Sequence, residues 1–236
     1  MKKKMKKDFK DKYSKWYKYY SNDFKLGRKN QFMSIFYQAR EAIMNPNINS
    51  MLEFGIGRGC TSAIVKHFKI KHVGVDFNDE LFFPDHVSTI LNYSDDKKYD
   101  IVCAFQVLEH NPPESVKSNL KKMKNLSNKY VYVSVPYSGR YISLNINLNL
   151  FSSKFGYLNK QVNFTWGRLF RKIRPVEDYK KRSDKYNPHW WEVGDKNFTK
   201  RDFKKIINSL DMKIEKSFHN EFFPYHLFYL LKKNTT

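Results

Sequence analysis

The stretch SMLEFGIGRGCTSAIVKHF, residues 50–68, decides the fold. Its first part, Ser50–Phe54, is a short apolar run typical of a buried strand, and Thr61–Phe68 has the periodicity of a helix. Between them lies a turn with glycine at positions 55, 57 and 59. Glycine permits a tight turn and lets the backbone approach a ligand, because it has no Cβ. The stretch therefore predicts a strand, a ligand-binding turn and a helix whose N-terminus offers free N–H groups.

The glycine turn also indicates the charge of its ligand. The dinucleotide-binding fingerprint has a third glycine or alanine three positions after the second. Here Cys60 stands at that position, and Gly59 comes one residue early. Glu53 lies two residues before Gly55, where a carboxylate would repel a pyrophosphate and attract a cation. The turn thus favours a cationic ligand over a dinucleotide.

The rest of the chain alternates strands and helices. An amphipathic helix from Asn30 to Met44 is stopped by Asn45-Pro46. The later patterns predict strands at His72–Asp76, Val87–Leu91, Tyr99–Phe105 and Tyr130–Val135, helices at Glu114–Leu126 and from the N-cap Thr199 to Leu210, and strands at Met212–His219 and His226–Lys232. Such alternation implies βαβ units and a parallel sheet. The short link between the last two strands predicts an antiparallel hairpin.

Two segments break this rhythm within a single predicted domain, residues 1–236. Residues 1–45 form a basic and aromatic N-terminal helical segment, whose aromatic cluster at 13–20 is expected to pack as a short helix. Residues 137–197 are aromatic, basic and rich in Asn and Ser, without a clear period. A long segment of this kind is usually functional or disordered, and its aromatic content argues against disorder. We therefore predict an ordered cap over the site, inserted after the fifth strand.

The charge balance is strongly positive, with 44 Lys and Arg against 23 Asp and Glu and a formal net charge of +21. This favours anionic partners such as nucleic acid, phosphorylated metabolites, nucleotide sugars or an acidic membrane surface. A lysine-rich solvated surface accounts for the same number equally well. The two cysteines, Cys60 and Cys103, indicate neither a disulfide framework nor a zinc site. The sequence has no apolar run typical of a signal peptide or a membrane span, which predicts a cytoplasmic protein.

Two further motifs follow the glycine turn in order. Asp76 ends the second predicted strand, about twenty residues after the first glycine, where a carboxylate can accept both hydroxyls of a ribose. Residues 99–110 then read YDIVCAFQVLEH. Together the three motifs resemble class I S-adenosylmethionine-dependent methyltransferases. The resemblance covers Ser50 to Pro136 at normal spacing.

The resemblance implies an α/β, Rossmann-like fold with a seven-stranded, mostly parallel sheet and a C-terminal antiparallel hairpin. It implies S-adenosylmethionine as the cofactor, with Glu53 and the glycines at its amino acid part, Asp76 at its ribose and Gln106 at its methionine side. The family often has an acidic residue after the third strand for the adenine; here that region is shortened and leaves Asn92 or Asp95 as candidates. The predicted cofactor-binding residues are Glu53, Gly55, Gly57, Gly59, Asp76, Phe77, Asn92 and Gln106.

The predicted catalytic residues are His110, His189 and Glu192. Methyl transfer to a hydroxyl needs in-line alignment and removal of the hydroxyl proton by a nearby His or carboxylate. The Trp pair between His189 and Glu192 suits stacking on a sugar or, alternatively, anchoring of the cap on the domain. His110 equally fits a structural role as the partner of a loop carbonyl. In relatives with a Val-Leu-Glu-His run, Glu and His sometimes bind a metal; with no third clear ligand nearby, the sequence predicts none.

The acceptor is predicted only as a class. The cluster NPHWWE at 187–192, followed by TKRDF at 199–203, more loosely resembles methyltransferases found with bacterial surface-polysaccharide genes. This favours O-methylation of a sugar, a nucleotide sugar or another small metabolite, phosphorylated or not, in surface-glycan biosynthesis. The alternative is an RNA methyltransferase that uses the basic surface. Against it, the run NPPE at 111–114 carries Glu114 where an aromatic would stack on a base. A donor-binding module without catalysis is a third class, although nothing in the donor loop looks degraded.

Overall fold

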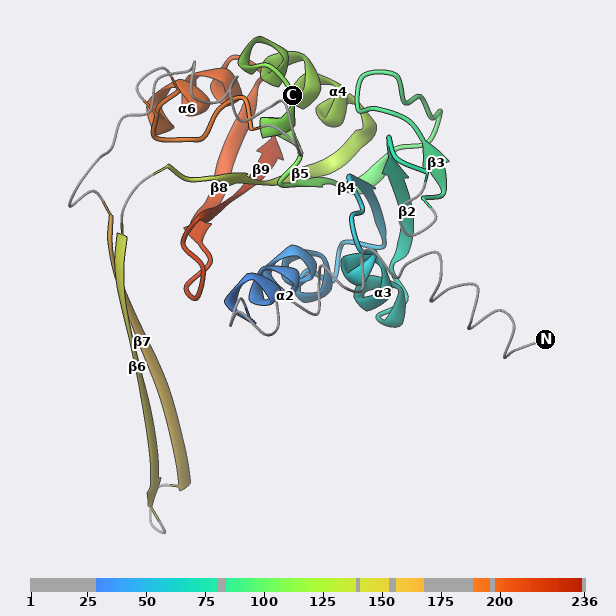
Figure 1. Cartoon of the computed structure of the whole chain (residues 1–236). Helices are drawn as coiled ribbons and strands as arrows, with labels where there is room; N and C mark the ends of the chain where they lie inside the picture. The colour runs from blue at the N-terminus through green and yellow to red at the C-terminus, as the bar shows by residue number, and fades with distance from the viewer. Residues whose placement is uncertain are drawn as a thin grey trace, which may run out of the picture.

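A seven-stranded sheet forms the centre of the protein, here described from a computed structural model (Figure 1). The structure describes residues 29–79, 84–138, 141–152, 156–167, 189–195 and 198–234. The strand order is β3-β2-β1-β4-β5-β9-β8. The pairs from β3 to β5 are parallel, whereas β9 pairs antiparallel with both β5 and β8. The predicted seven-stranded, mostly parallel sheet with a C-terminal antiparallel hairpin is confirmed.

The bounds of the elements are close to those that the sequence patterns predict. The helices are α2 (Lys29–Met44), α3 (Cys60–His67), α4 (Val116–Leu126) and α6 (Lys200–Asn208). The strands of the sheet are β1 (Ser50–Phe54), β2 (Lys71–Asp76), β3 (His86–Val87), β4 (Tyr99–Phe105), β5 (Ser127–Pro136), β8 (Met212–His219) and β9 (His226–Lys233). Short 3₁₀ turns, Leu108–His110 and Pro113–Ser115, lie between β4 and α4. The aromatic cluster at 13–20 lies outside the described residues.

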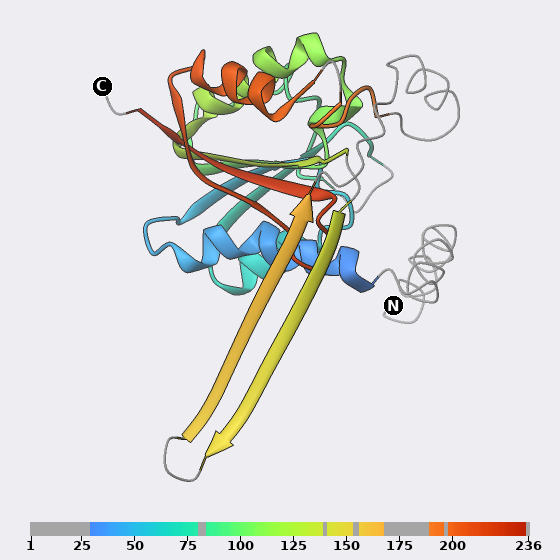
Figure 2. The same ribbon diagram turned by 90° about the vertical axis from the view of Figure 1, so that its left-hand side faces the viewer.

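Two helical layers cover the sheet, with α2 and α3 on one face and α4 and α6 on the other (Figures 1 and 2). The side chains between sheet and helices form two apolar clusters. One contains Leu120 of α4 and Phe203 of α6, and the other contains Tyr37 of α2 and Val65 of α3. Central strands of a sheet covered on both faces are apolar on both sides. The apolar run Ile101–Phe105 of β4, in which every residue is buried, follows from this layering.

The third strand is shorter than predicted and ends earlier. The apolar residues of Val87–Leu91 predict a strand, but β3 comprises only His86–Val87. The reason is its position at the edge of the sheet, where β2 is its only neighbour. Val87 pairs with Asp76, the last residue of β2, and Ser88 donates the last backbone hydrogen bond to the oxygen of Asp76 at 2.9 Å. Ile90 is instead buried in the core by the turn that follows.

The insertion after β5 contains a long β-hairpin that extends away from the sheet domain (Figures 1 and 2). Its strands, β6 (Tyr141–Ser152) and β7 (Gly156–Gly167), pair antiparallel over their whole length and with no other described strand. In this part of residues 137–197 the chain forms a hairpin that extends from the domain, and the cap over the site stays a prediction for the insertion. Apolar residues do alternate along β6, but Asn fills the positions between them. Asn is uncommon in strands, which hid the period of two.

The end of the insertion, residues 189–195, does lie on the domain. The side chain of Trp191 is buried, its Nε1 donates a hydrogen bond to the backbone oxygen of Asn111 at 3.0 Å, and its ring packs 4.3 Å from that of Phe198. Trp190 donates its backbone N–H to the oxygen of Glu109 at 2.8 Å and packs against the core. The Trp pair anchors this segment on the sheet domain, which is the alternative that the sequence left open.

Candidate active site

A cavity of about 330 Å³ opens at the carboxyl ends of β1 and β4. From β1 the chain continues outward to β2 and β3, whereas β4 begins the other half of the sheet, so these two strands flank the switch point of the topology. Ligands of open α/β sheets bind at that place. The cavity is lined by Ser34, Ile35, Gln38, Glu53, Gly55, Ile56, Gly57, Arg58, Cys60, Thr61, Phe105, Gln106, His110 and His226.

The glycine turn forms one wall of the cavity, and its two lining glycines have different reasons to be glycine. Gly55 and Gly57 both have positive φ, of 73° and 51°, which side chains disfavour. A Cβ on Gly55 would lie 2.3 Å from Cγ2 of Val107, whereas one on Gly57 would meet nothing within 4 Å. Gly55 thus permits close packing, and Gly57 leaves open space beside the turn. Gly59, the N-cap of α3, does not line the cavity.

Glu53 brings a buried carboxylate to the cavity wall. Glu53 is the second-last residue of β1. Its Oε2 lies 2.8 Å from Nε2 of His72 on the neighbouring strand β2. Burial raises the pKa of Glu53 above its ordinary value, while the bond to His72 opposes this. A cation entering the cavity would find this carboxylate in a low-dielectric wall, where attraction is strong.

The residues predicted to hold the ribose and adenine lie outside the cavity lining. Asp76 is buried at the end of β2, where its Oδ1 accepts the backbone N–H of Asn78 at 3.1 Å. Its charge is close enough to Glu53 to contribute to the raised pKa of that carboxyl. Phe77 is exposed, and Asn92 is exposed in the turn after β3. Their roles in donor binding stay predictions.

Gln106 follows β4 in an unusual backbone conformation. Its φ is 56°, its N–H donates to the backbone oxygen of Ser134 at 2.9 Å, and its side-chain Nε2 donates to Oγ of Ser134 at 3.2 Å. A residue other than glycine held in this region marks a place where the surroundings fix the backbone, often at a functional site. Gln106 turns the chain from β4 into the 3₁₀ turn that carries Glu109 and His110.

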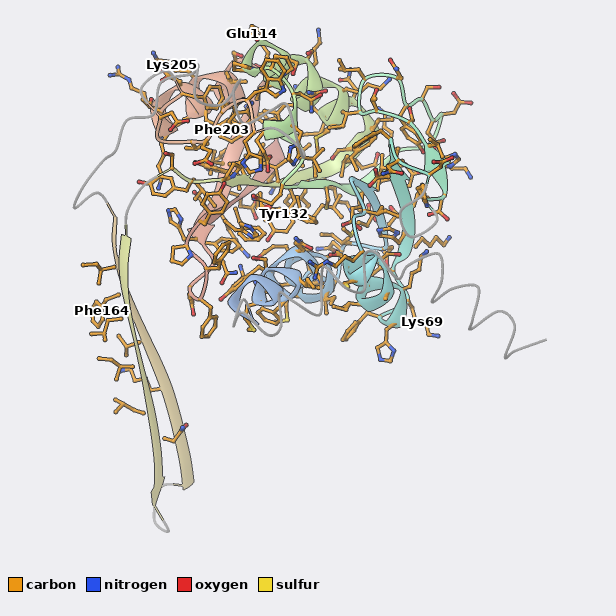
Figure 3. All side chains as sticks on the ribbon, in the orientation of Figure 1. Lys69, Glu114, Tyr132, Phe164, Phe203 and Lys205 are labelled. Carbon is orange, nitrogen blue, oxygen red and sulfur yellow. The ribbon has the colours of Figure 1, made fainter. Side chains whose placement is uncertain are left out.

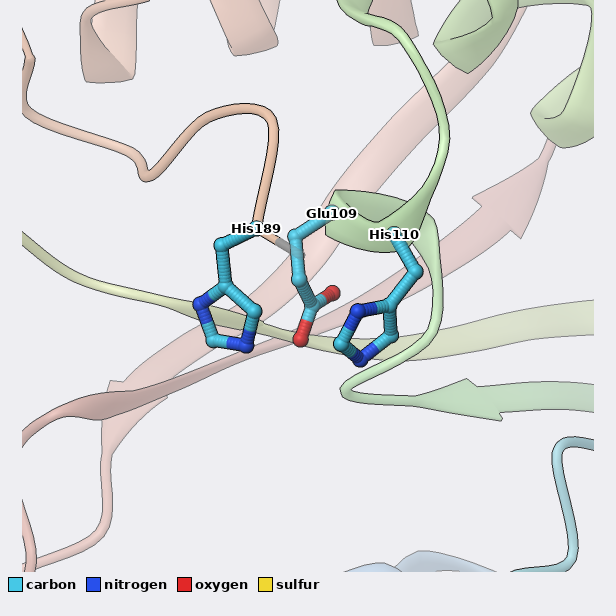
Figure 4. A group of neighbouring side chains, drawn as sticks. All are labelled: Glu109, His110 and His189. Atoms are coloured by element: carbon cyan, nitrogen blue, oxygen red, sulfur yellow. The ribbon is translucent and has the colours of Figure 1, made fainter. Parts of the chain in front are cut away.

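Glu109, His110 and His189 meet beside the cavity, and one ligating atom from each lies within 4.8 Å of the others (Figure 4). Figure 4 shows the carboxylate of Glu109 between the two imidazoles. Glu109 is fully buried, and neither carboxylate oxygen has a hydrogen-bond partner on another described residue. Burial raises the pKa of Glu109 to about 8, with a further contribution from the charge of Glu192. The structure thus unites His110 with His189, 79 positions apart in sequence.

The third predicted catalytic residue, Glu192, joins this group through Tyr225. The hydroxyl of Tyr225 donates to Oε1 of Glu192 at 2.7 Å and lies 3.2 Å from Nδ1 of His189. Oε1 of Glu192 is also 3.6 Å from that nitrogen. Sequence reasoning missed Tyr225, which lies in the link between β8 and β9.

His226, next along the chain, lines the cavity and was also missed. Its Nδ1 forms a 2.6 Å hydrogen bond with Oγ of Ser34, which in turn accepts from Nδ2 of Asn220 at 2.7 Å. Burial lowers the pKa of His226 to about 3, so its ring is neutral near pH 7. The ring forms part of a fixed polar wall on the side where α2 crosses the cavity.

Solved structures share this fold. A magnesium protoporphyrin IX methyltransferase from Synechocystis PCC 6803, with bound SAM, has a TM-score of 0.54 and 13% identity over 88% of this chain and 81% of its own. An S-adenosylmethionine-dependent methyltransferase from Clostridium acetobutylicum has a TM-score of 0.54 and 12% identity over 93% and 99%. CalS10, an amino pentose methyltransferase from Micromonospora echinaspora, has a TM-score of 0.52 and 8% identity over 89% and 96%.

These likenesses define the class of fold, that of S-adenosylmethionine-dependent methyltransferases. No protein-family model matches the sequence. No curated protein matches it either. Among the described residues, no helix is long and apolar enough to cross a membrane.

Proposed function

We propose that the protein is an S-adenosylmethionine-dependent methyltransferase that methylates an oxygen atom of a small molecule. The observation that carries this is the shape of one cavity, which has Glu53 and the glycine turn on one side and His110 on another. The first side suits a cationic donor, and the second suits a hydroxyl that must lose its proton. Its volume of about 330 Å³ falls within the range of small-molecule sites, about 300–1,000 Å³.

The donor side fits S-adenosylmethionine in two respects. The buried carboxylate of Glu53 offers a partner for a cation, and the space beside Gly57 lets a ligand approach the backbone. Glu53 and Gly57 would hold the amino acid part of the donor, Asp76 its ribose, and Gln106 its methionine side. When bound, the donor supplies an electrophilic methyl group on a positively charged sulfur.

The acceptor side belongs to the residues around Glu109. His110 and His189 would orient the acceptor hydroxyl toward the donor side of the cavity and assist the departure of its proton. Tyr225 and Glu192 hold the ring of His189 through its Nδ1. Trp191 anchors the segment that carries His189 on the domain.

The acceptor that we propose is a sugar, a nucleotide sugar or another small metabolite, in surface-glycan biosynthesis. CalS10, which shares the fold, is an amino pentose methyltransferase. The runner-up, an RNA methyltransferase, is favoured by the net charge of +21 and by the aromatic residues interleaved with lysines at 13–20.

Transfer of a radiolabelled methyl group into a cell extract separates these classes. We expect label in a small-molecule or glycan fraction that resists ribonuclease, and none when the protein carries Glu53→Gln. Glu114→Gln, which changes an exposed carboxylate away from the cavity, is the matched control and should retain activity. Label in RNA would replace the small-molecule acceptor with the runner-up. Failure to label any fraction, from extracts of several growth conditions, would count against the methyltransferase activity itself.

A further inference from the structure

A buried carboxylate lies at the acceptor side of the site. Glu109 is fully buried, and its two oxygens make no hydrogen bond to another described residue. Burying a carboxylate in this way is costly unless a cation or hydrogen-bond donors compensate it. The two groups that flank it are imidazoles, one from the same 3₁₀ turn and one from the anchored segment (Figure 4). The carboxylate is therefore poised for a cation held jointly with His110 and His189.

The geometry of the three side chains suits a single metal ion. Ligand atoms at about 2.1 Å from one metal lie at most about 4.2 Å from each other. The three atoms here lie within 4.8 Å of one another. A tetrahedral ion holds such atoms about 3.4 Å apart, so a closure of at most about 1.4 Å by side-chain rotation brings all three into one coordination sphere. Two imidazoles and one carboxylate leave further positions open for water or an acceptor.

The orientation of His189 is a second observation that favours a metal site. Its Nδ1 is already engaged by the hydroxyl of Tyr225 and lies 3.6 Å from Glu192, which leaves Nε2 for a ligand. A metal-binding imidazole almost always has its other nitrogen held by a hydroxyl, carbonyl or carboxylate, which fixes both tautomer and ring direction. The Tyr225–Glu192 pair supplies that support.

We propose that Glu109, His110 and His189 bind one divalent transition-metal cation, of the Mn²⁺ or Zn²⁺ type, with the acceptor oxygen as an additional ligand. Imidazole favours these ions over Mg²⁺, which prefers oxygen ligands and water. The claim that the acceptor oxygen is an additional ligand rests on the proposed function. A ligated hydroxyl loses its proton to solvent more readily. Its oxygen then bonds to the methyl carbon while the carbon–sulfur bond breaks and sulfur keeps the electron pair. His110 and His189 then assist the departure of the proton through the metal that they hold, and do not accept the proton themselves.

Titration of Mn²⁺ into the untagged full chain, without donor or acceptor, tests the site by the loss of the free-ion spin-resonance signal. We expect one Mn²⁺ per chain, displaced by Zn²⁺ and not by equal Mg²⁺. Glu109→Gln and His189→Ala should each weaken binding at least about tenfold. His67→Ala, which removes an exposed imidazole on α3, should leave it unchanged. Because Glu109→Gln alters the core, its melting temperature is compared with that of His189→Ala, whose ring is partly exposed.

The outcomes separate this inference from the proposed function. Absence of stoichiometric Mn²⁺ and Zn²⁺ binding, or equal binding by His189→Ala, overturns the metal site whether or not the protein binds S-adenosylmethionine. Metal binding without any affinity for S-adenosylmethionine keeps the site and removes the methyltransferase assignment. With both bound, metal removal by a chelator should abolish methyl transfer and restoration of Mn²⁺ should recover it; full activity after removal would overturn the role of the metal in the reaction.

A second feature, independent of the cavity, is the apolar face of the β6–β7 hairpin. Ile142, Leu144, Ile146 and Leu148 alternate along β6, and Phe164 on β7 pairs with Leu144. These five side chains are between 38 and 57% exposed. Figure 3 shows Phe164 directed away from the sheet domain, so this side chain does not pack against the described part of that domain. Exposed apolar faces of this length mark an interaction surface.

The charge of the insertion indicates which kind of partner covers this apolar face. Residues 137–197 contain twelve Lys and Arg against five Asp and Glu. Two copies of such a segment would repel each other, which disfavours a dimer through this face. An anionic membrane surface offers both an apolar layer and the opposite charge. We propose that the hairpin lies flat on an anionic lipid surface, with its apolar face in the acyl boundary and its open edges hydrated among the headgroups.

Sedimentation with vesicles tests this surface. We expect the full chain to bind vesicles of phosphatidylcholine with 30% phosphatidylglycerol, and to bind pure phosphatidylcholine much less. The pair Leu144→Ser and Phe164→Ser should weaken binding at least about tenfold, because membrane affinity scales with the buried apolar area. Phe68→Ser, on an exposed apolar side chain at the end of α3, is the control. Equal binding by the double variant overturns the proposal. Binding to RNA but not to vesicles would also overturn the proposal. A dimer in gel filtration that dissociates in the double variant would overturn it as well.

Discussion

At the scale of single residues, the glycine turn shows how neighbouring positions with the same amino acid serve different needs. Gly55 and Gly57 both require positive φ, but only Gly55 has another side chain in contact distance of a Cβ. Strain at positive φ costs about 1–2 kcal/mol for a residue with a Cβ. Overpacking adds about 1–3 kcal/mol where a rigid neighbour such as Val107 cannot move away.

We therefore expect Gly55→Ala to lower the free energy of unfolding more than Gly57→Ala, by about 1–3 kcal/mol. The measurement is urea denaturation of both variants at one pH. Donor affinity should fall in both, but in Gly57→Ala without the larger loss of stability, because the added methyl group enters open space beside the turn. Equal destabilisation of the two variants would show that Val107 does not restrict this turn.

His226 gives a residue-scale prediction on pH. Its pKa is lowered to about 3 by burial, with a smaller contribution from the charge of His189. In the unfolded chain the pKa of histidine is about 6.5. Between these values the unfolded state binds a proton that the folded state does not, so stability is complete above about pH 6.5 and falls as the pH decreases. Ser34 and the ring of Tyr225 adjoin His226, and neither carries a charge that would compensate a proton.

From pH 7.5 to pH 5.0, His226 should remove about 2 kcal/mol from the free energy of unfolding, at about 1.4 kcal/mol per pH unit below 6.5. Urea denaturation at both values checks this against His226→Gln, for which that share of the loss should disappear. His219, whose burial lowers its pKa to about 4, contributes in the same direction in both proteins. The difference between the two slopes therefore isolates His226. Parallel slopes would contradict the assigned pKa.

At the scale of elements, α6 illustrates a boundary that local chemistry sets. Thr199 accepts the backbone N–H of Asp202 with its hydroxyl oxygen, while the carboxylate of Asp202 accepts the backbone N–H of Thr199, which completes a capping box. Ser115, at the same position before α4, makes no such bond.

Thr199→Ala should lower the free energy of unfolding by about 1 kcal/mol, the usual worth of an N-cap. Ser115→Ala should cost less, since its side chain caps no helical N–H. Thermal melting of the two variants beside the parent protein gives the comparison. A larger loss in Ser115→Ala would mean that the capping box does not decide where α6 begins.

The elements that sequence predicts well are those whose signals are local. The strands β4 and β8 have the predicted bounds. The length of β3 depends on where β2 ends and has no local signal, whereas the apolar alternation in β6 is obscured by the polar residues between. The beginning of β9 also contributes a residue to the site. Because β9 is antiparallel to β5, His226 lies opposite Pro136 at the carboxyl end of β5, beside the cavity.

At the scale of the whole molecule, the sheet order brings the proposed donor-binding and acceptor-binding residues together at the carboxyl ends of its central strands. Sequence reasoning named Glu53, Gln106, His110 and His189, and the structure brings the first three to one cavity and the fourth to its border. It did not identify Glu109 with His189 as a group, because 80 residues separate them and only tertiary packing brings them together. The insertion divides into a part that builds the site, residues 189–195, and a hairpin that extends from it.

The central claim is that the cavity between β1 and β4 binds S-adenosylmethionine, and calorimetric titration tests it most directly. We predict one site per chain for S-adenosylmethionine, no heat with NAD, and a loss of affinity of at least about tenfold in Glu53→Gln, since a buried charge partner is removed. Glu114→Gln, on the surface, should bind as the parent protein does. Binding of NAD, or unchanged affinity for S-adenosylmethionine in Glu53→Gln, would contradict the account.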